Sequence, residues 1–128
     1  RLLNRTRARA QALADEFGPV IEVLDWAHRA GALDGAALLV QTTNQGMVGE
    51  PALDLPLDAL PRHALVADIV YTPLQTPLLA QAQARGHACV NGLGMLLHQA
   101  RPAFASWFGV EPQVTPALRE AVLATLRG

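Results

Sequence analysis

The chain has 128 residues, a formal net charge of −1 and 51% hydrophobic residues. This composition is sufficient for one packed domain and provides no basic surface for nucleic acid. No apolar run approaches the roughly 18 residues that span a bilayer, and the single cysteine, Cys89, cannot form a disulfide within the chain. Without a signal-peptide core, the sequence predicts a cytoplasmic protein with no membrane or nucleic-acid partner.

Apolar patterning, glycine and proline positions and capping residues predict an alternation of helices and strands. The expected elements are helices over 7–17, 25–29, 77–85, 93–108 and 115–126, strands over 20–23, 36–40, 64–70 and 87–90, and a mobile loop over 47–62 with one helical turn near 57–60. The apolar pair Leu2-Leu3 directly precedes a helix, so we expect residue 1 to lie inside a strand of a longer protein. This order is typical of an α/β protein with a doubly wound parallel sheet.

Right-handed crossovers place the carboxyl ends of parallel strands at one edge of a sheet, where open α/β sheets bind ligands. We therefore expect the segments that follow the strands to line one crevice: Asn4, 41–46, 69–71 and 91–94.

An arginine cluster follows the first predicted strand. Asn4, Arg5 and Thr6 lead into a helix that carries Arg9, at the place where a dinucleotide-binding sheet meets the adenosine ribose. An acidic residue there would favour NAD, whereas forked guanidinium donors at a helix N-terminus suit the 2′-phosphate of NADP. On spacing alone, a solvated arginine face is an equally good interpretation.

Three further segments carry polar residues or glycines at strand ends: 41–49, 68–79 and 91–99. Seen singly, each has an ordinary explanation, such as a strand-to-loop cap or a packed tyrosine. Asp68 falls in a strand expected to be buried, where an unpaired carboxylate is costly, so a structural hydrogen-bonding role is favoured for it. The histidines lack metal-ligand spacing, and no metal site is predicted.

Together these segments resemble the shikimate dehydrogenase family. The resemblance rests on Asn-Arg-Thr-x-x-Arg at 4–9, on Gln-Thr-Thr-Asn-Gln-Gly at 41–46, on the tyrosine and prolines of 68–79, and on Gly-Leu-Gly-Met-Leu-Leu-His-Gln at 92–99. Gln41, Thr72 and Asn91 stand where the family usually has asparagine, asparagine and aspartate. The resemblance implies an NADP cofactor bound by Asn4, Arg5, Thr6, Arg9, Thr42, Thr43, Asn44, Ile69, Gly92 and Met95, and a substrate bound by Tyr71 and Gln99.

The resemblance also implies a partial domain. Residues 1–128 would form an N-terminally truncated, Rossmann-like NADP-binding domain, with the sheet and crossover helices in 1–92 and C-terminal helices in 93–128. The family's glycine-rich loop, its substrate domain and its catalytic lysine and aspartate would lie upstream. Because all ten basic residues are arginine, no lysine of this chain can serve in proton transfer, and no catalytic residue is assigned to it. A central strand edge would be exposed, so we expect association with the missing N-terminal part, and a homodimer is possible.

The implied activity is the NADP-dependent, reversible reduction of 3-dehydroshikimate to shikimate in aromatic amino-acid biosynthesis, with the fragment alone inactive. Two alternatives stay open. One is a quinate/shikimate dehydrogenase paralogue that uses NAD, and the other is a non-catalytic nucleotide-binding module.

Overall fold

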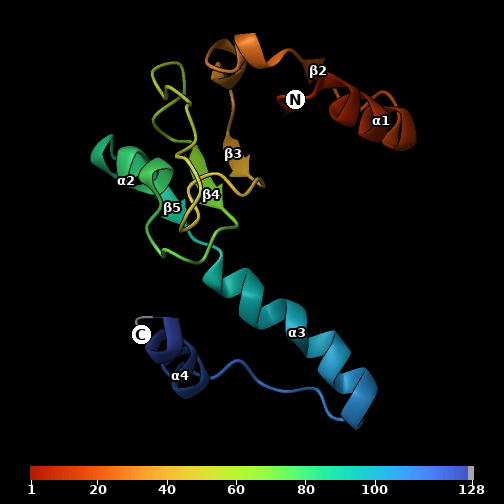
Figure 1. The fold of residues 1–128 in the computed structure, drawn as a ribbon, viewed down its shortest axis with the longest axis vertical. Coiled ribbons are helices and arrows are strands. Elements are labelled where there is room, and N and C mark those ends of the chain that lie inside the picture. The colour runs from red at the N-terminus through yellow and green to blue at the C-terminus, as the bar shows by residue number, and fades with distance from the viewer. Residues whose placement is uncertain (127–128) are drawn as a thin grey trace.

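The computed structural model describes residues 1–126, which form an α/β structure with two parallel sheets (Figure 1). The smaller sheet pairs β1 (Leu2–Leu3) with β2 (Val23–Leu24), and the larger has the order β3 (Leu38–Gln41), β4 (Leu65–Asp68), β5 (Ala88–Val90). The predicted fold class is confirmed. The helices are α1 (Arg7–Phe17), η1 (Trp26–His28), η2 (Gly31–Leu33), α2 (Pro77–Ala84), α3 (Leu93–Phe108) and α4 (Pro116–Leu126), of which η1 and η2 are short 3₁₀ helices.

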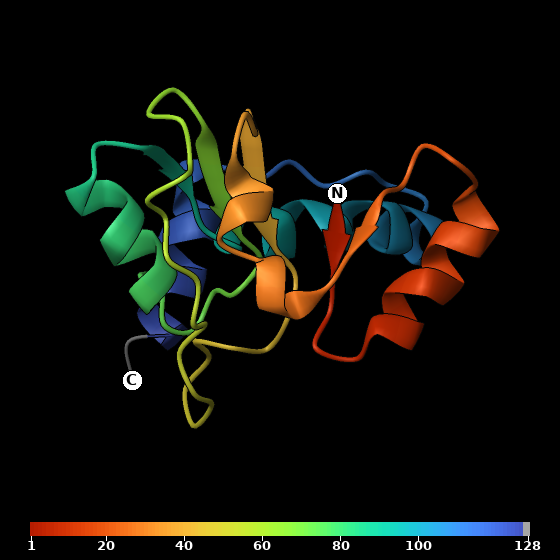
Figure 2. The same cartoon turned by 90° about the horizontal axis from the view of Figure 1, so that it is seen from above.

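The two sheets lie side by side with a gap between β1 and β3. From above, the β1–β2 pair and α1 occupy one side of the molecule, and β3, β4, β5 and α2 occupy the other (Figure 2). Hydrogen bonds from the Arg1 guanidinium to the carbonyl oxygens of Ala32 (2.8 Å) and Asp34 (2.5 Å) link the start of β1 to the segment at η2. The sheet of the sequence prediction is therefore present as two parts rather than as one continuous sheet.

Local signals fix α2. Thr76 is its N-cap, Pro77 occupies its first turn, and the Leu79 amide donates to Thr76 Oγ1 over 3.3 Å. Gly86 follows the helix with a φ of +85°, a conformation that costs other residues energy. The sequence prediction for this helix differs from the structure by one residue.

Two strands differ from their predicted bounds for identifiable reasons. A turn at Gly18, closed by the Ile21 amide on the Gly18 carbonyl (3.3 Å), leaves Val20 84% exposed, so β2 begins only at Val23. At the other strand, the Val70 amide donates to the Asp68 side chain (3.0 Å) instead of to a neighbouring strand, and β4 ends at Asp68.

The second half of the long connection between β3 and β4 is anchored in the core, whereas its predicted mobility stays a prediction for the exposed residues 47–52. Leu55, Leu57 and Leu60 are buried and pack in one cluster with Val66 of β4 and with α2. The helical turn expected near 57–60 is a single hydrogen-bonded turn, with the Leu60 amide 3.1 Å from the Leu57 carbonyl. These leucines pack between the loop and the sheet, but their spacing in the sequence follows neither a helix nor a strand period. The sequence pattern therefore did not indicate that they are buried.

Helix α3 leaves the sheet and extends away from it (Figure 1). Its first turns bury Leu93 and Leu97 against Leu123 of α4. Its far end carries an aromatic patch, defined as Phe104, Trp107 and Phe108, whose side chains are 41%, 78% and 64% exposed. None of the described helices is long and apolar enough to cross a membrane.

The anchored connection can be tested by truncating Leu57. Leu57 is fully buried, so Leu57→Ala should lower the free energy of unfolding by about 2–5 kcal/mol through lost burial and the cavity left behind. Leu13→Ala is the matched control, because Leu13 is 45% exposed and its truncation should cost less than about 0.5 kcal/mol. Urea unfolding of both variants measures the difference. Equal midpoints would show that the connection does not belong to the core.

Candidate functional site

Three of the four segments expected at the site meet at the carboxyl edge of the larger sheet. The register places Gln41 of β3 beside Asp68 of β4, so the two strands end together. From there run the β3 loop (residues 42–51) and the β4 loop (residues 69–76). The Val48 amide donates to the Thr72 carbonyl (3.2 Å), and the Gly92 amide donates to the Val70 carbonyl (3.0 Å). Residues after β3, β4 and β5 are thus held against one another.

The side chain of Gln41 braces the β3 loop from inside. It is buried, its Nε2 donates to the carbonyl oxygens of Thr43 (3.1 Å) and Gln45 (2.9 Å), and the Thr43 amide donates to its Oε1. Thr42 and Asn44 consequently face outward and are exposed, while Thr43 is half-buried. Gln41, which stands where the resembled family usually has asparagine, therefore makes a complete set of hydrogen bonds here.

Gly92 lies directly against the backbone of the β4 loop. A Cβ atom at this position would be 1.9 Å from the Ile69 carbonyl oxygen and 2.9 Å from the Val70 carbonyl carbon. Only glycine allows this approach, because both obstructing groups are backbone. The contact places half-buried Ile69 at the start of α3, whose first turn carries Met95 with 42% of its surface exposed. These three cofactor candidates therefore share one corner.

The two substrate candidates lie on different elements, Tyr71 on the β4 loop and Gln99 on α3. Tyr71 is half-buried and packs against the cluster of Leu93, Leu97 and Leu123. Gln99 is exposed and follows Leu97 by two residues on the same helix. Within residues 1–126, no hydrogen bond joins the Tyr71 and Gln99 side chains. The described contacts therefore do not bring these two side chains together.

The arginine segment lies in the smaller sheet, across the gap from β3. The Thr6 amide donates to Asn4 Oδ1 over 2.8 Å, which fixes the turn between β1 and α1. Arg7 forms an ion pair with Asp25, with 2.8 Å between guanidinium nitrogen and carboxylate oxygen. Arg5 and Arg9 are exposed and form no ion pair with any residue the structure describes. Two guanidinium groups are thus available to an anion.

A slot of about 530 Å³ separates β1 from β3. Its walls are mainly apolar, and they include Leu2, Leu3, Leu38, Leu39 and Val40. On β3, Leu38 and Val40 remain 53% and 47% exposed, unusually open for apolar residues of a parallel strand. The adjacent edges of β1 and β3 have no strand partner among the described residues.

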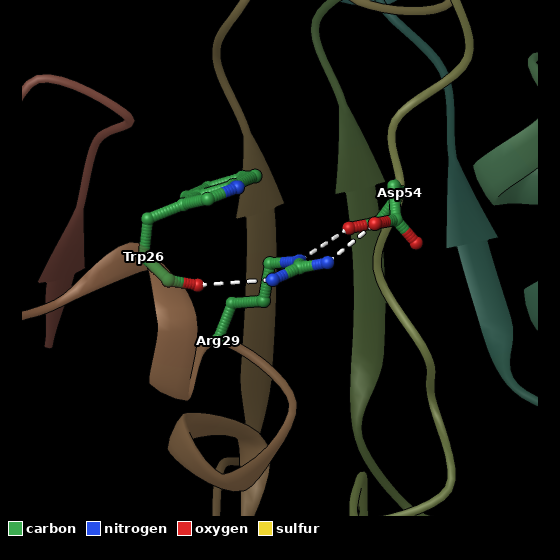
Figure 3. A network of polar contacts seen from close by, with 3 residues as sticks. All are labelled: Trp26, Arg29 and Asp54. Atoms are coloured by element: carbon green, nitrogen blue, oxygen red, sulfur yellow. Dashed lines mark hydrogen bonds and ion pairs between the residues drawn. The ribbon is translucent and has the colours of Figure 1, made fainter.

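Arg29 closes one side of this slot and was not predicted from the sequence. Its guanidinium lies over the Trp26 ring, 5.4 Å from the ring centre, donates to the Asp54 carbonyl (2.6 Å) and pairs with the Asp54 carboxylate (Figure 3). It also donates to the Trp26 carbonyl over 3.2 Å. These contacts tie η1 to a loop 25 residues away in sequence, so no local pattern could have indicated them.

Other titratable groups have structural explanations. Burial raises the pKa of the Cys89 thiol, which keeps it protonated and poorly nucleophilic near neutral pH. The ring of buried His87 lies 3.3 Å from the Ala64 carbonyl. Residues 1–126 contain no cluster of three or more His, Cys, Asp or Glu side chains that could hold a metal ion.

The glycine contact predicts a large difference between two neighbouring substitutions. Gly92→Ala should lower the free energy of unfolding by about 3 kcal/mol or more, because the backbone of Ile69 and Val70 must move. Gly94→Ala is the control: no atom lies within 4 Å of its added Cβ, and alanine favours a helix by up to about 1 kcal/mol. Thermal unfolding of both variants provides the measurement. A Gly92→Ala variant as stable as Gly94→Ala would contradict the close approach.

Comparisons with known proteins show which family and fold this chain resembles. The family described as Shikimate 5'-dehydrogenase C-terminal domain matches residues 92–123. The Shikimate dehydrogenase (NADP(+)) of Dinoroseobacter shibae is 60% identical over 124 residues, which cover 97% of this chain and 45% of that protein. The chain thus spans about half the length of the curated relatives it matches.

Two solved structures show the same fold. Quinate dehydrogenase from Corynebacterium glutamicum, in complex with NAD, aligns with a TM-score of 0.84 at 31% identity, covering 95% of this chain and 45% of that chain. Shikimate 5-dehydrogenase from Thermus thermophilus, in complex with NADP(H) and shikimate, aligns with a TM-score of 0.76 at 34% identity, covering 97% and 44%. The resemblance predicted from the sequence is confirmed, as is the Rossmann-like α/β fold.

Proposed function

We propose that this relative of the shikimate dehydrogenases is the nucleotide-binding part of an enzyme that interconverts 3-dehydroshikimate and shikimate with NADP. The observation that carries the proposal is the 60% identity with a shikimate dehydrogenase (NADP(+)) across 97% of the chain. The gathering of the β3 loop, the β4 loop and the start of α3 at one sheet edge supports it, because open α/β sheets bind nucleotides there.

In this proposal Arg5 and Arg9 bind the 2′-phosphate of NADP, and Asn4 and Thr6 shape the turn that presents them. Both guanidinium groups lie at the N-terminal end of α1, where backbone amides also favour an anion. Thr42, Thr43 and Asn44 contact the ribose and phosphate groups from the β3 loop. Ile69, Gly92 and Met95 flank the nicotinamide, which supplies or accepts the hydride.

The substrate contacts of this chain are the Tyr71 hydroxyl and the Gln99 amide, which can both bind the hydroxyl or carboxylate groups of a small polyol acid. In this proposal the chain supplies orientation rather than proton transfer, since it contains no lysine. We propose that the catalytic lysine and aspartate belong to another part of a longer protein.

The same longer protein would fill the slot between β1 and β3. An added parallel strand there would give the order β2, β1, added strand, β3, β4, β5, which matches the usual doubly wound sequence of a dinucleotide-binding sheet. The strand would cover Leu38 and Val40, and its following turn would reach the carboxyl edge where the pyrophosphate is expected. The aromatic patch of α3 would be a second contact with the remainder of the protein. A homodimer and a cytoplasmic location stay predictions.

The alternative with specific support is a quinate-active paralogue that uses NAD. It is favoured by the high structural similarity to a quinate dehydrogenase in complex with NAD. The unpaired Arg5 and Arg9 favour NADP over NAD, because NAD carries no 2′-phosphate. A non-catalytic nucleotide-binding module would be favoured if the longer protein bound NADP but oxidised neither shikimate nor quinate.

Cofactor choice can be tested in the longer protein with single arginine substitutions. Arg5→Gln and Arg9→Gln should each raise the KM for NADP about tenfold, since each removes charged hydrogen bonds to the 2′-phosphate, and should leave the KM for NAD unchanged. Arg7→Gln is the control on the same helix, because Arg7 is engaged with Asp25. Initial rates with both coenzymes give the answer. Parallel losses for NADP and NAD would refute the 2′-phosphate assignment.

Substrate binding can be tested at the other end of the site. Tyr71→Phe and Gln99→Ala should each raise the KM for shikimate about tenfold while the KM for NADP stays constant, because each loses a hydrogen bond to the substrate alone. His98→Ala is the matched control: His98 is also exposed and adjacent to Gln99, but it projects on another side of α3. Unchanged shikimate kinetics in both variants would remove Tyr71 and Gln99 from the site, and the same assays with quinate would identify the preferred substrate.

A further inference from the structure

We infer that the buried carboxylate of Asp68 is the centre of a positioning network that fixes the β3 loop and the β4 loop relative to each other. The network consists of Gln41, Asp68 and Thr76, which are 3%, 2% and 1% exposed. The inference rests on the proposed function in one respect: the loops must carry the cofactor and substrate contacts for their relative position to affect catalysis.

Asp68 is satisfied by hydrogen bonds from three separate parts of the fold. Its Oδ1 accepts from the Val70 amide (3.0 Å) and, at the long end of the range, from Gln41 Nε2 (3.4 Å), and its Oδ2 accepts from the Thr76 hydroxyl (2.7 Å). No cation of the described chain pairs with it. The carboxylate thus joins the end of β3, the start of the β4 loop and the first turn of α2.

Both carboxylate oxygens of Asp68 act as acceptors in this network, which orients the donors around them. The Gln41 Nε2 donates to the Thr43 and Gln45 carbonyls and also lies 3.4 Å from Asp68 Oδ1, and these three acceptors together leave its Oε1 for the Thr43 amide. The single proton of the Thr76 hydroxyl is used on Asp68, so its oxygen is free to accept from the Leu79 amide. The hydrogen bonding of both loops therefore runs through this buried side chain.

The two loops also touch directly. The Val48 amide donates to the Thr72 carbonyl (3.2 Å), and Gly46 packs beside the Thr76 side chain, so that an added Cβ would lie 3.5 Å from Thr76 Cβ. A shift of Thr76 or Asp68 would consequently move the β3 loop with its outward Thr42 and Asn44. The same shift would move Ile69 and Tyr71 on the other side.

Stability alone does not explain a carboxylate at this position. Removing a charge from water is costly, and a well-packed apolar side chain at a buried site is often as stable or more stable. Asp68 lies at the end of β4 between the β3 loop and the β4 loop, where the directions of its hydrogen bonds determine how the two loops are held. The geometry therefore assigns Asp68, Gln41 and Thr76 as positioning residues.

The test uses the longer protein with Asp68→Asn and Thr76→Val, which keep side-chain size but break the donor and acceptor pattern. Thr76→Ser retains the hydroxyl and serves as the conservative rescue, and Thr125→Val is the outside control, because Thr125 is exposed on α4 and its hydroxyl donates only to the Val122 carbonyl (2.7 Å). Asp68→Asn and Thr76→Val should raise the KM for both NADP and shikimate about tenfold, with a smaller fall in kcat. A purely structural role would instead reduce the amount of folded enzyme and leave both KM values unchanged, which overturns the inference.

Hydrogen exchange gives a second measurement that needs no turnover. Thr76→Val should speed exchange about tenfold at the Thr43 and Gln45 amides of the other loop, while Thr76→Ser and Thr125→Val leave it unchanged. Faster exchange confined to residues 70–79 would overturn the coupling. A wild-type protein that binds no NADP and oxidises no shikimate would refute the proposed function instead, and the exchange pattern would still decide whether the loops are coupled.

Discussion

The parallel register between β3 and β4 is the constraint on which the rest of the structure depends. It sets Gln41 beside Asp68, and both strands end at that pair. A slip of one residue would turn each side chain of one strand to the opposite face, so Asp68 would lose Gln41 and Val66 would leave the core. The hydrophobic cluster around Leu57, Val66 and Ala82 fixes the register in the core. The hydrogen bonds of Asp68 fix it at the carboxyl ends of the strands.

The core and the candidate site are therefore coupled within a few residues. Along β4, Val66 and Asp68 point to the same side, and the change from apolar to polar marks the change from core packing to the hydrogen-bonded strand end. Gly92, which follows β5, also links packing to the strand ends. Because it has no side chain, the start of α3 can lie against the Ile69 carbonyl. A rigid sheet edge with loops braced by buried polar groups is well suited to hold a flexible coenzyme in one orientation.

Much of this arrangement could be predicted from the sequence, because its signals are local. Thr76-Pro77 and Gly86 define α2 through capping and backbone preference, and apolar runs with no polar alternation indicate parallel strands. The alternation of elements then implies that strand ends converge. The prediction failed where the deciding contact is distant: β2 begins where β1 offers a partner, and the Arg29–Asp54 pair joins residues 25 positions apart. Leu55, Leu57 and Leu60 were missed because an irregular loop buries side chains without a repeating pattern.

The apolar surfaces left open on the molecule share one physical explanation. Leu38 and Val40 face the slot beside β1, and the aromatic patch stands at the far end of α3, so two separate regions carry large apolar side chains in contact with water. Elsewhere the same chain buries its leucines efficiently, in a core where Leu57, Leu93 and Val66 are fully enclosed. The chain packs well in its core but leaves a strand edge unpaired. This contrast is best explained if the exposed apolar surfaces normally contact additional protein structure. The added strand proposed for the slot would pair the open edge of β3 and so account for both the slot and the unpaired edge.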